Sequence, residues 1–333
     1  MLEHGGGLRA AAARYGIPPG DWLDLSTGIN PNGWSPPAVP PRVWQRLPES
    51  GDGLESAAAA YYGAAELLAV AGSQAAIQVL PLLRGRARIG VLHPSYAEHA
   101  HAWRRAGHRV DLLDAAELAD AADRLDVLVL ANPNNPTGLG FSIESLLDWR
   151  RRLAERNGWL VVDEAFVDAT PAASVSGHAG LPGLVILRSL GKFFGLAGAR
   201  VGFVLAQAAL LEPLQERLGP WAVAGPSRWA ATRALADRVW QARARLELSG
   251  ASQRLAELLQ RHELPAAAGT ALFRWVPATR ARFWRDALAR RGILVRRFDE
   301  PSGLRFGLPG TEADWRRLEG ALTAIRAERP SGA

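Results

Sequence analysis

Short apolar segments alternate with helix-like patterns over most of the first 226 residues. Each segment is almost continuously apolar and is bounded by turn-forming residues, which is typical of strands buried on both faces of a sheet. The expected strands are residues 67–71, 87–92, 109–113, 126–130, 159–163, 184–188 and 201–205. The expected helices include residues 73–83, 97–106, 143–156 and 208–217. The pattern predicts an α/β fold with a mostly parallel sheet sandwiched by helices.

The pattern changes near residue 227, where a long helical region begins and continues to about residue 262. Beyond it we expect a small C-terminal α+β domain, with strands at 271–276, 293–297 and 304–308 and helices at 280–290 and 312–326. Residues 30–41 are proline-rich and too stiff for a helix or a central strand. The expected divisions are an N-terminal arm and loop packed with the small domain and active site (1–40), a large domain (41–226), and a bridging helix with the small domain (227–333).

Composition narrows the class of protein. With 48% apolar and 22% charged residues, the chain is an ordinary globular protein. Charges or turn residues interrupt each apolar run before about 18 residues accumulate, so we expect no transmembrane helix. The first residues carry no secretory signal, and a cytoplasmic location is expected. The absence of cysteine excludes disulfides and thiolate chemistry.

The net charge of +6 is less informative. Basic and acidic residues are interleaved, and no basic block reaches the length of a nucleic-acid-binding tail. The simplest interpretation is an arginine-rich solvated surface, with no nucleic acid partner. An acidic small substrate, such as a phosphate ester, is the alternative explanation.

One basic residue differs from all the others. Lys192 is the only lysine, and the other 38 basic residues are arginines. Such a composition indicates that arginine has replaced lysine at positions where only the charge matters. The remaining lysine is then a candidate for chemistry that needs a primary amine. Survival by chance is the alternative.

Four segments follow the carboxyl ends of predicted strands, where ligands bind in parallel α/β sheets. The segments are 72–74, 132–138, 163–166 and 189–200, the last of which contains Lys192. Ser73 opens a helix and could either bind an anion there or simply cap the helix. Asp163 ends a buried strand, where a carboxylate needs a partner unless it caps a helix or lies in a surface loop. The asparagine-rich segment could equally be a structural turn.

Other familiar motifs are absent from the sequence. There is no P-loop around Lys192, no H-E-x-x-H, and no G-x-G-x-x-G after a strand. His93, His99, His101 and His108 are close in sequence but have no matching carboxylate arrangement. We interpret them as surface or core residues and expect no metal site.

In their order and spacing, the four segments resemble the fold-type I, aspartate-aminotransferase-like enzymes that use pyridoxal 5′-phosphate (PLP). The resemblance rests on S-x-x-K with an arginine eight residues later, following N-P-T-G and D-E-A-F. It implies that Lys192 forms the Schiff base with PLP and that Asp163 pairs with the ring nitrogen. It implies further cofactor contacts from Asn135 to the ring hydroxyl, from Tyr96 by stacking, and from Ser73, Gln74, Ser189 and Arg200 to the phosphate.

Two positions depart from the pattern of these enzymes. Phe166 stands where many relatives carry a tyrosine that bonds the ring hydroxyl. Leu47 stands where relatives carry a tyrosine that reaches the cofactor phosphate of a neighbouring subunit. The resemblance still implies a homodimer, although this contact between subunits is in doubt.

The N-terminal segments resemble one branch of the superfamily. The start His4-Gly5-Gly6 and the segment at residues 23–33, which contains Asn30-Pro31, are similar to threonine-phosphate decarboxylases of cobalamin biosynthesis. Histidinol-phosphate aminotransferases share the core and the Asn-Pro segment but not this start. The resemblance implies decarboxylation of L-threonine O-3-phosphate to (R)-1-amino-2-propanol O-2-phosphate.

The same resemblance implies how this phosphorylated amino acid is bound. Arg305 matches the arginine that receives the substrate carboxylate, which suits a planar guanidinium. Arg296 is the expected phosphate ligand, with Arg297 as an alternative in register. The other implied substrate contacts are His4, Gly5, Asn30 and Asn135.

No residue in the sequence decides between loss of the substrate carboxylate and loss of the Cα proton. An aminotransferase acting on a phosphate ester is therefore the second interpretation. A PLP-binding regulator without catalysis is a remote third, which would need an appended helix-turn-helix domain. The arm before Pro31 is too short for one.

Overall fold

The computed structural model describes residues 5–328. The chain divides into a larger unit, Gly33–Asn135 with Leu139–Ala244, and a smaller unit, Met1–Asn32 with Pro136–Gly138 and Arg245–Ala333. The divisions near the arm and the long helical region therefore fall after residues 32 and 244, whereas the sequence pattern placed them after residues 40 and 226. Each unit is described by itself.

The larger unit is built on a seven-stranded sheet of order β2-β8-β7-β6-β5-β3-β4. The strands are β2 (Leu67–Val70), β3 (Arg88–Leu92), β4 (Arg109–Leu113), β5 (Val127–Ala131), β6 (Trp159–Asp163), β7 (Leu184–Ser189) and β8 (Gly202–Leu205). Only β8 runs antiparallel to its neighbours. The predicted mostly parallel sheet is confirmed, with every strand within one residue of its expected limits. The carboxyl ends of the other strands and the amino end of β8 therefore share one edge.

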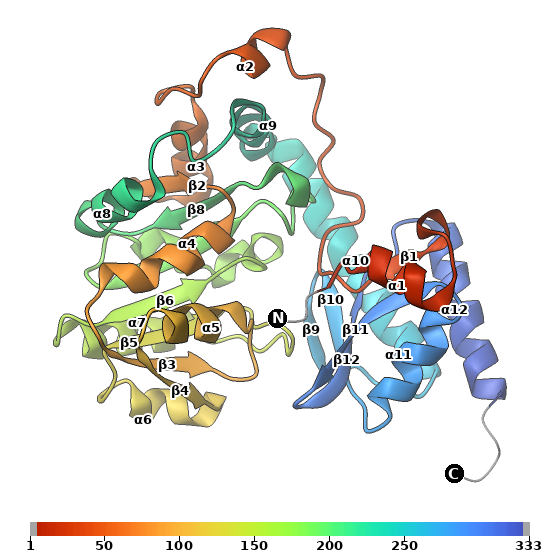
Figure 1. Cartoon of the computed structure of the whole chain (residues 1–333). Helices are drawn as coiled ribbons and strands as arrows, with labels where there is room; N and C mark the ends of the chain where they lie inside the picture. Colours follow the sequence, from red (N-terminus) through yellow and green to blue (C-terminus); the bar gives the residue numbers. More distant parts are fainter. Residues whose placement is uncertain (1–4, 329–333) are drawn as a thin grey trace. The chain divides into compact units, whose positions relative to one another are not determined.

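Helices cover both faces of this sheet, which explains why its strands are almost continuously apolar. The helices of the unit are α2 (Pro41–Gln45), α3 (Leu54–Tyr62), α4 (Ser73–Val79), α5 (Glu98–Arg105), α6 (Leu118–Ala121), α7 (Ile143–Ala154), α8 (Ala208–Leu218) and α9 (Gly225–Ala236). Figure 1 shows α4 and α5 crossing one face, over a core that includes Val129 and Val161. The alternate residues Leu128 and Val162 are buried on the other face, and α7 packs against β6.

The smaller unit has a five-stranded sheet of order β1-β11-β12-β10-β9. Its strands are β1 (Leu23–Leu25), β9 (Ala268–Thr270), β10 (Phe273–Pro277), β11 (Ile293–Asp299) and β12 (Ser302–Gly307). Its helices are α1 (Leu8–Tyr15), α11 (Ala281–Ala289) and α12 (Glu312–Ala327). The arm supplies β1, which pairs parallel with β11. Three residues are too few for a readable pattern, so the sequence did not predict this strand.

The long helix expected at residues 227–262 is wrong in one respect, because it is two helices. Helix α9 ends at Ala236 and α10 (Arg238–Arg261) begins after Asp237, whose backbone leaves the helical region. The Asp237 carboxylate accepts hydrogen bonds from Trp240 N and Trp34 Nε1, both at 3.0 Å. The bond from Trp240 N caps the start of α10, and the bond from Trp34 Nε1 holds the Asp237 side chain in place. Within residues 5–328, no helix is both long and apolar enough to cross a membrane.

Candidate active site

A cavity of about 130 Å³ lies in the larger unit, at the edge of the sheet where the strand ends meet. It is lined by Ser73, Gln74, Tyr96, Ala131, Asn135, Asp163, Ala165, Phe166, Ser189, Lys192 and Arg200. All eight residues that the resemblance assigns to cofactor contacts are in this lining. The parallel topology brings them together, because their loops follow different strands that end at one edge.

Asp163 is fixed at the end of β6 by two hydrogen bonds. One carboxylate oxygen lies 2.9 Å from His99 Nε2, and the other accepts from Ala165 N at 3.0 Å. Asp163 is 5% exposed and His99 is 2% exposed. Burying a carboxylate without such partners costs a large desolvation free energy, so the hydrogen bonds from His99 and Ala165 N are what allow Asp163 to be buried here.

Sequence reasoning missed the role of His99 by interpreting it only as a surface or core histidine. It is indeed buried, but it bonds Asp163 and its ring lies edge-on to Tyr96 with the centroids 6.0 Å apart. The only signal in the sequence is that His99 lies three residues after Tyr96, where the turn before α5 brings His99 N to within 3.2 Å of Tyr96 O.

Tyr96 is oriented by the side chain of Gln74. The Tyr96 hydroxyl donates to Gln74 Oε1 at 3.1 Å, and Gln74 Nε2 donates to Glu98 at 2.8 Å. Burial, followed by the negative charges of Glu98 and Asp163, raises the pKa of Tyr96 to about 12, so the phenol keeps its proton. The side-chain amide of Gln74 therefore positions the Tyr96 ring. The backbone N–H of Gln74 is the group left to bind an anion.

One corner of the cavity has the chemistry of an anion site. Ser189 pairs with Gly202, and a Cβ on Gly202 would lie 2.6 Å from Ser73 N. A Cβ on Gly72 would lie 2.6 Å from a terminal nitrogen of Arg200. Because both positions are glycine, the hydroxyls of Ser73 and Ser189, the backbone N–H of Ser73 and the guanidinium of Arg200 can come close together. Ser73 is the first residue of α4 and Gly72 is the N-cap residue, so the interpretation of Ser73 as the N-cap is wrong.

Lys192 lies in a loop that is anchored by aromatic packing. Its Nζ is 5.6 Å from the centroid of the Phe166 ring. The next two residues, Phe193 and Phe194, are fully buried against Trp240, with centroids 5.3 and 5.5 Å from its ring. Trp34 N donates to Phe194 O at 2.9 Å. The amine therefore projects from a rigid support.

A buried ionic network that the sequence pattern did not predict lies next to two cavity-lining residues in the chain. Arg188 donates to Glu164 at 2.5 Å and also to Asp168, and Ser174 donates to Glu164 at 2.6 Å. Arg188 is 2% exposed and both carboxylates are fully buried. Burial raises the pKa of Glu164, against the opposing effect of Arg188. Because Glu164 adjoins Asp163 in sequence and Arg188 adjoins Ser189, the network joins two strand ends that line the cavity.

The asparagines of the loop at residues 132–138 fall into two groups, those that hold the loop in place and one that lines the cavity. Asn132 Oδ1 accepts from Phe141 N, and Asn134 Nδ2 donates to Pro94 O, both at 2.8 Å. Asn135 instead lines the cavity. Asn132 and Asn134 therefore support the loop, and a contact from Asn135 to the cofactor stays a prediction.

The smaller unit places two arginines on one face of its sheet. Arg305 of β12 lies directly opposite Arg296 of β11. Arg305 is buried and donates to Ser26 O at 2.6 Å. Burial, and then repulsion from Arg296, lowers the pKa of Arg305 to about 10, so it remains a cation at neutral pH. Arg297, the next residue of β11, forms an ion pair with Asp299 at 2.7 Å.

Three further residues were expected to bind substrate from the arm. Gly5 is described, and it packs directly against Ser26. Asn30 is buried, and its side-chain oxygen accepts from Asn32 N at 2.9 Å. His4 lies outside the described residues.

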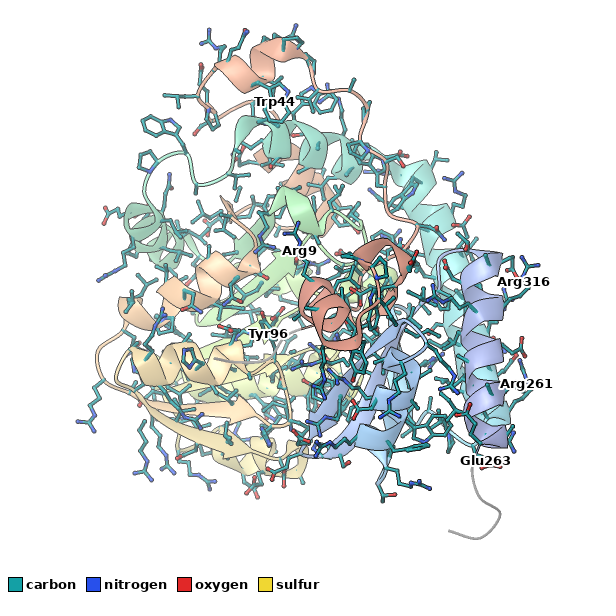
Figure 2. All side chains as sticks on the ribbon, turned by 45° about the vertical axis from the view of Figure 1, so that its right-hand side comes forward. Arg9, Trp44, Tyr96, Arg261, Glu263 and Arg316 are labelled. Carbon is teal, nitrogen blue, oxygen red and sulfur yellow. The ribbon has the colours of Figure 1, made fainter. Side chains whose placement is uncertain are left out.

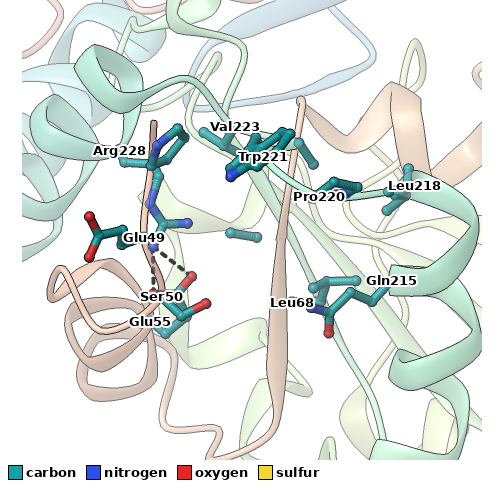
Figure 3. Close-up of a pocket in the computed structure, with 14 residues that line it drawn as sticks. Glu49, Ser50, Glu55, Leu68, Gln215, Leu218, Pro220, Trp221, Val223 and Arg228 are labelled. Carbon is teal, nitrogen blue, oxygen red and sulfur yellow. Dashed lines mark hydrogen bonds and ion pairs between the residues drawn. The ribbon is translucent and has the colours of Figure 1, made fainter. Parts of the chain in front are cut away.

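A second cavity in the larger unit, of about 410 Å³, has different chemistry. Figure 3 shows the guanidinium of Arg228 directed at the carboxylate of Glu55, and it also bonds Asp52 at 2.6 Å. The cation of this cavity is therefore already neutralised. Over residues 5–328, no group of three or more side chains of the metal-ligating types could hold a metal ion.

Comparisons with known proteins agree with this geometry. Residues 21–322 match the family model for aminotransferase class I and II. The chain is 57% identical to a threonine-phosphate decarboxylase from Pseudomonas aeruginosa, over 98% of both chains. It is 43% identical to a threonine-phosphate decarboxylase from a Sinorhizobium species, over 97% of this chain and 98% of that one.

The fold is also found in solved structures. A histidinol-phosphate aminotransferase from Sinorhizobium meliloti, solved in complex with pyridoxal 5′-phosphate, superposes with a TM-score of 0.85. The match covers 97% of this chain and 95% of that chain at 20% identity, so it bears on the fold alone. The family model and the two relatives together establish that the chain belongs to the aminotransferase class I and II family.

Proposed function

We propose that this protein is a PLP-dependent threonine-phosphate decarboxylase of cobalamin biosynthesis. Its reaction converts L-threonine O-3-phosphate into (R)-1-amino-2-propanol O-2-phosphate and CO₂. The observation that carries the proposal is the 57% identity to a threonine-phosphate decarboxylase over almost the whole chain. The cavity supports it, because the cofactor residues of the resemblance line a single space.

The residues of the cavity fit PLP. The corner formed by Ser73, Ser189 and Arg200 suits a phosphate dianion, because two hydroxyls and a guanidinium line it and two glycines allow these groups to come close together. Asp163 offers a buried carboxylate for the ring nitrogen, and Tyr96 offers a flat ring for stacking. Lys192 supplies the only lysine amine in the chain for covalent attachment.

When bound, PLP supplies a ring that accepts the electron pair of the bond broken at Cα. The carboxylate of Asp163 would keep a proton on the ring nitrogen, and His99 and Ala165 N hold that carboxylate in place. Lys192 Nζ, which would hold the cofactor, is also the group that we propose would return a proton to the substrate Cα. The protein thus determines where charge is stabilised and where the proton arrives.

The choice of bond depends on how the substrate is oriented. We propose that Arg305 binds the substrate carboxylate, and that Arg296, Asn30 and the arm residues His4 and Gly5 bind its phosphate. Binding at two ends fixes the orientation of the molecule, and such positioning can be worth several kcal/mol. Orientation can therefore select loss of the carboxylate over loss of the Cα proton.

The proposal is tested by incubating the PLP-loaded protein with L-threonine O-3-phosphate, with and without 2-oxoglutarate. We expect CO₂ release without any keto acid. Unphosphorylated threonine should be a far poorer substrate, because the phosphate-binding groups would lack a partner. Turnover that requires 2-oxoglutarate and yields glutamate would instead support an aminotransferase, the reaction of the histidinol-phosphate enzyme with the same fold.

We also propose that the protein is a homodimer. Trp44, Leu47 and Trp221 of the larger unit are 68%, 62% and 59% exposed, and Figure 2 shows Trp44 projecting from α2. Exposed large apolar side chains of this kind are typical of a surface that another chain covers. Light scattering should give the mass of a dimer, and a monomer at micromolar concentration would contradict the proposal.

A further inference from the structure

Ser26 occupies a junction in the smaller unit that the proposed function does not yet use. It follows β1 and is 2% exposed. Its Oγ accepts from Gly6 N at 2.8 Å and donates to Asp24 Oδ1 at 2.6 Å. Its N–H donates to the same Asp24 oxygen at 2.9 Å, and its carbonyl accepts from Arg305 at 2.6 Å. Every polar atom of Ser26 is therefore engaged.

The backbone of Gly5, in the arm, lies in close contact with Ser26. A Cβ on Gly5 would lie 2.4 Å from Ser26 O, so only glycine allows the contact. Gly6 has a φ of 81°, a backbone conformation that also favours glycine. The start of the arm is thus shaped to lie against the carbonyl to which Arg305 donates.

Asp24 determines how the Ser26 hydroxyl is used. Because Asp24 Oδ1 takes the hydroxyl proton, a lone pair of Ser26 Oγ is left for Gly6 N–H. Asp24 lies opposite Leu294 of β11, two residues before Arg296. Asp24 and Ser26 together therefore connect the arm to Arg305 and to β11, the strand that carries Arg296.

We propose that Ser26 is a specificity-determining positioning residue that keeps the phosphate-binding arm in register with the carboxylate-binding Arg305. This inference rests on the proposed function. The Ser26 hydroxyl holds the arm, whereas its backbone carbonyl holds Arg305. Loss of the hydroxyl alone therefore loosens the phosphate end of the substrate site and leaves the carboxylate end intact. The defect falls on recognition of the phosphate and not on the chemical step.

The variant Ser26→Ala tests this, because it removes one oxygen and keeps the peptide groups that bond Asp24 and Arg305. We expect the KM for L-threonine O-3-phosphate to rise about tenfold, as for the loss of one buried hydrogen bond. We expect kcat to change by less than about twofold, and kcat/KM for unphosphorylated threonine to stay the same. Ser26→Thr, which retains a hydroxyl, should recover most of the affinity.

The matched control is Ser302→Ala. Ser302 belongs to the same unit and donates one hydrogen bond, to Ala278 O at 2.8 Å, but it is exposed and does not contact the arm. Its replacement should leave both substrates unaffected. An equal loss with both substrates in Ser26→Ala, or a loss confined to kcat, would overturn the proposal in favour of a purely structural role.

Amide hydrogen exchange at Gly6 provides a readout that does not depend on activity. Gly6 N–H should exchange more rapidly in Ser26→Ala than in the parent and in Ser302→Ala, because its acceptor is gone. Unchanged exchange would contradict the proposal whatever the kinetics show. If the parent does not decarboxylate threonine phosphate, the proposed function fails, whereas the exchange comparison still decides whether Ser26 holds the arm.

Discussion

Replacing Asp163 with asparagine removes the charge proposed to face the ring nitrogen while preserving the shape of the site. The asparagine oxygen can still accept from Ala165 N, and its amide can face His99, the two partners that now hold the carboxylate. The fold should therefore survive. The proposed contact at the ring nitrogen changes from a charge-assisted hydrogen bond to a neutral one.

The size of the effect follows from the burial of the site. Asp163 is 5% exposed, and two unit charges about 3 Å apart interact by roughly 5 kcal/mol at an effective dielectric constant of about 20. A loss of only half of this stabilisation lowers the rate by about 10²-fold. We therefore expect kcat for L-threonine O-3-phosphate to fall about 10²-fold or more in Asp163→Asn, with PLP still held through its phosphate.

The assay is steady-state kcat together with cofactor occupancy measured by visible absorbance. Asp120→Asn is the matched control, because it makes the same chemical change at an exposed position of α6 in the same unit. It should retain parental kcat. A loss below tenfold in Asp163→Asn at full occupancy would refute the electrostatic role and leave Asp163 as a structural residue.

Three further variants test other parts of the account. Borohydride should fix the cofactor to the peptide that contains Lys192, and Lys192→Arg should lose turnover with an unchanged circular dichroism spectrum; near-native activity would contradict this. His99→Phe should lower kcat about tenfold with little change in KM, because one buried hydrogen bond to the Asp163 carboxylate is lost; an unchanged kcat would show that His99 only fills space. Arg188→Met should lower the free energy of unfolding by about 3–5 kcal/mol in denaturant titrations, because two buried carboxylates lose their cation. Burial already raises the pKa of Glu164, so protonation in the folded state should relieve this penalty and the deficit should shrink as pH falls from about 8 to about 5; an equal deficit at both values would contradict it.

The parts of the fold that the sequence predicted are those with a strong local signal. The central strands of the larger sheet, such as β5 and β7, are buried along their whole length, so each is an apolar run by itself. The four strand-end loops were predictable for the same reason, because each directly follows such a run. Parallel pairing then brings the loops to one edge without any further information from side chains.

The features that the sequence did not reveal depend on partners far along the chain. Strand β1 exists because it pairs with β11, some 270 residues later. The break at Asp237 depends on Trp34, and the junction at Ser26 depends on Arg305. His99 bonds a carboxylate 64 positions away. Single residues give no periodic signal, so contacts of this kind emerge only when the fold is known.

The most direct test of the decarboxylase assignment is a proton NMR time course of the reaction in D₂O. The PLP-loaded protein and L-threonine O-3-phosphate are the only reactants, without a keto acid. We predict accumulation of 1-amino-2-propanol phosphate with a single deuterium on the amine-bearing carbon, because one solvent-derived proton replaces the departing carboxylate. A substrate that merely exchanges its Cα proton for deuterium, with no loss of CO₂, would contradict the account and indicate an aminotransferase.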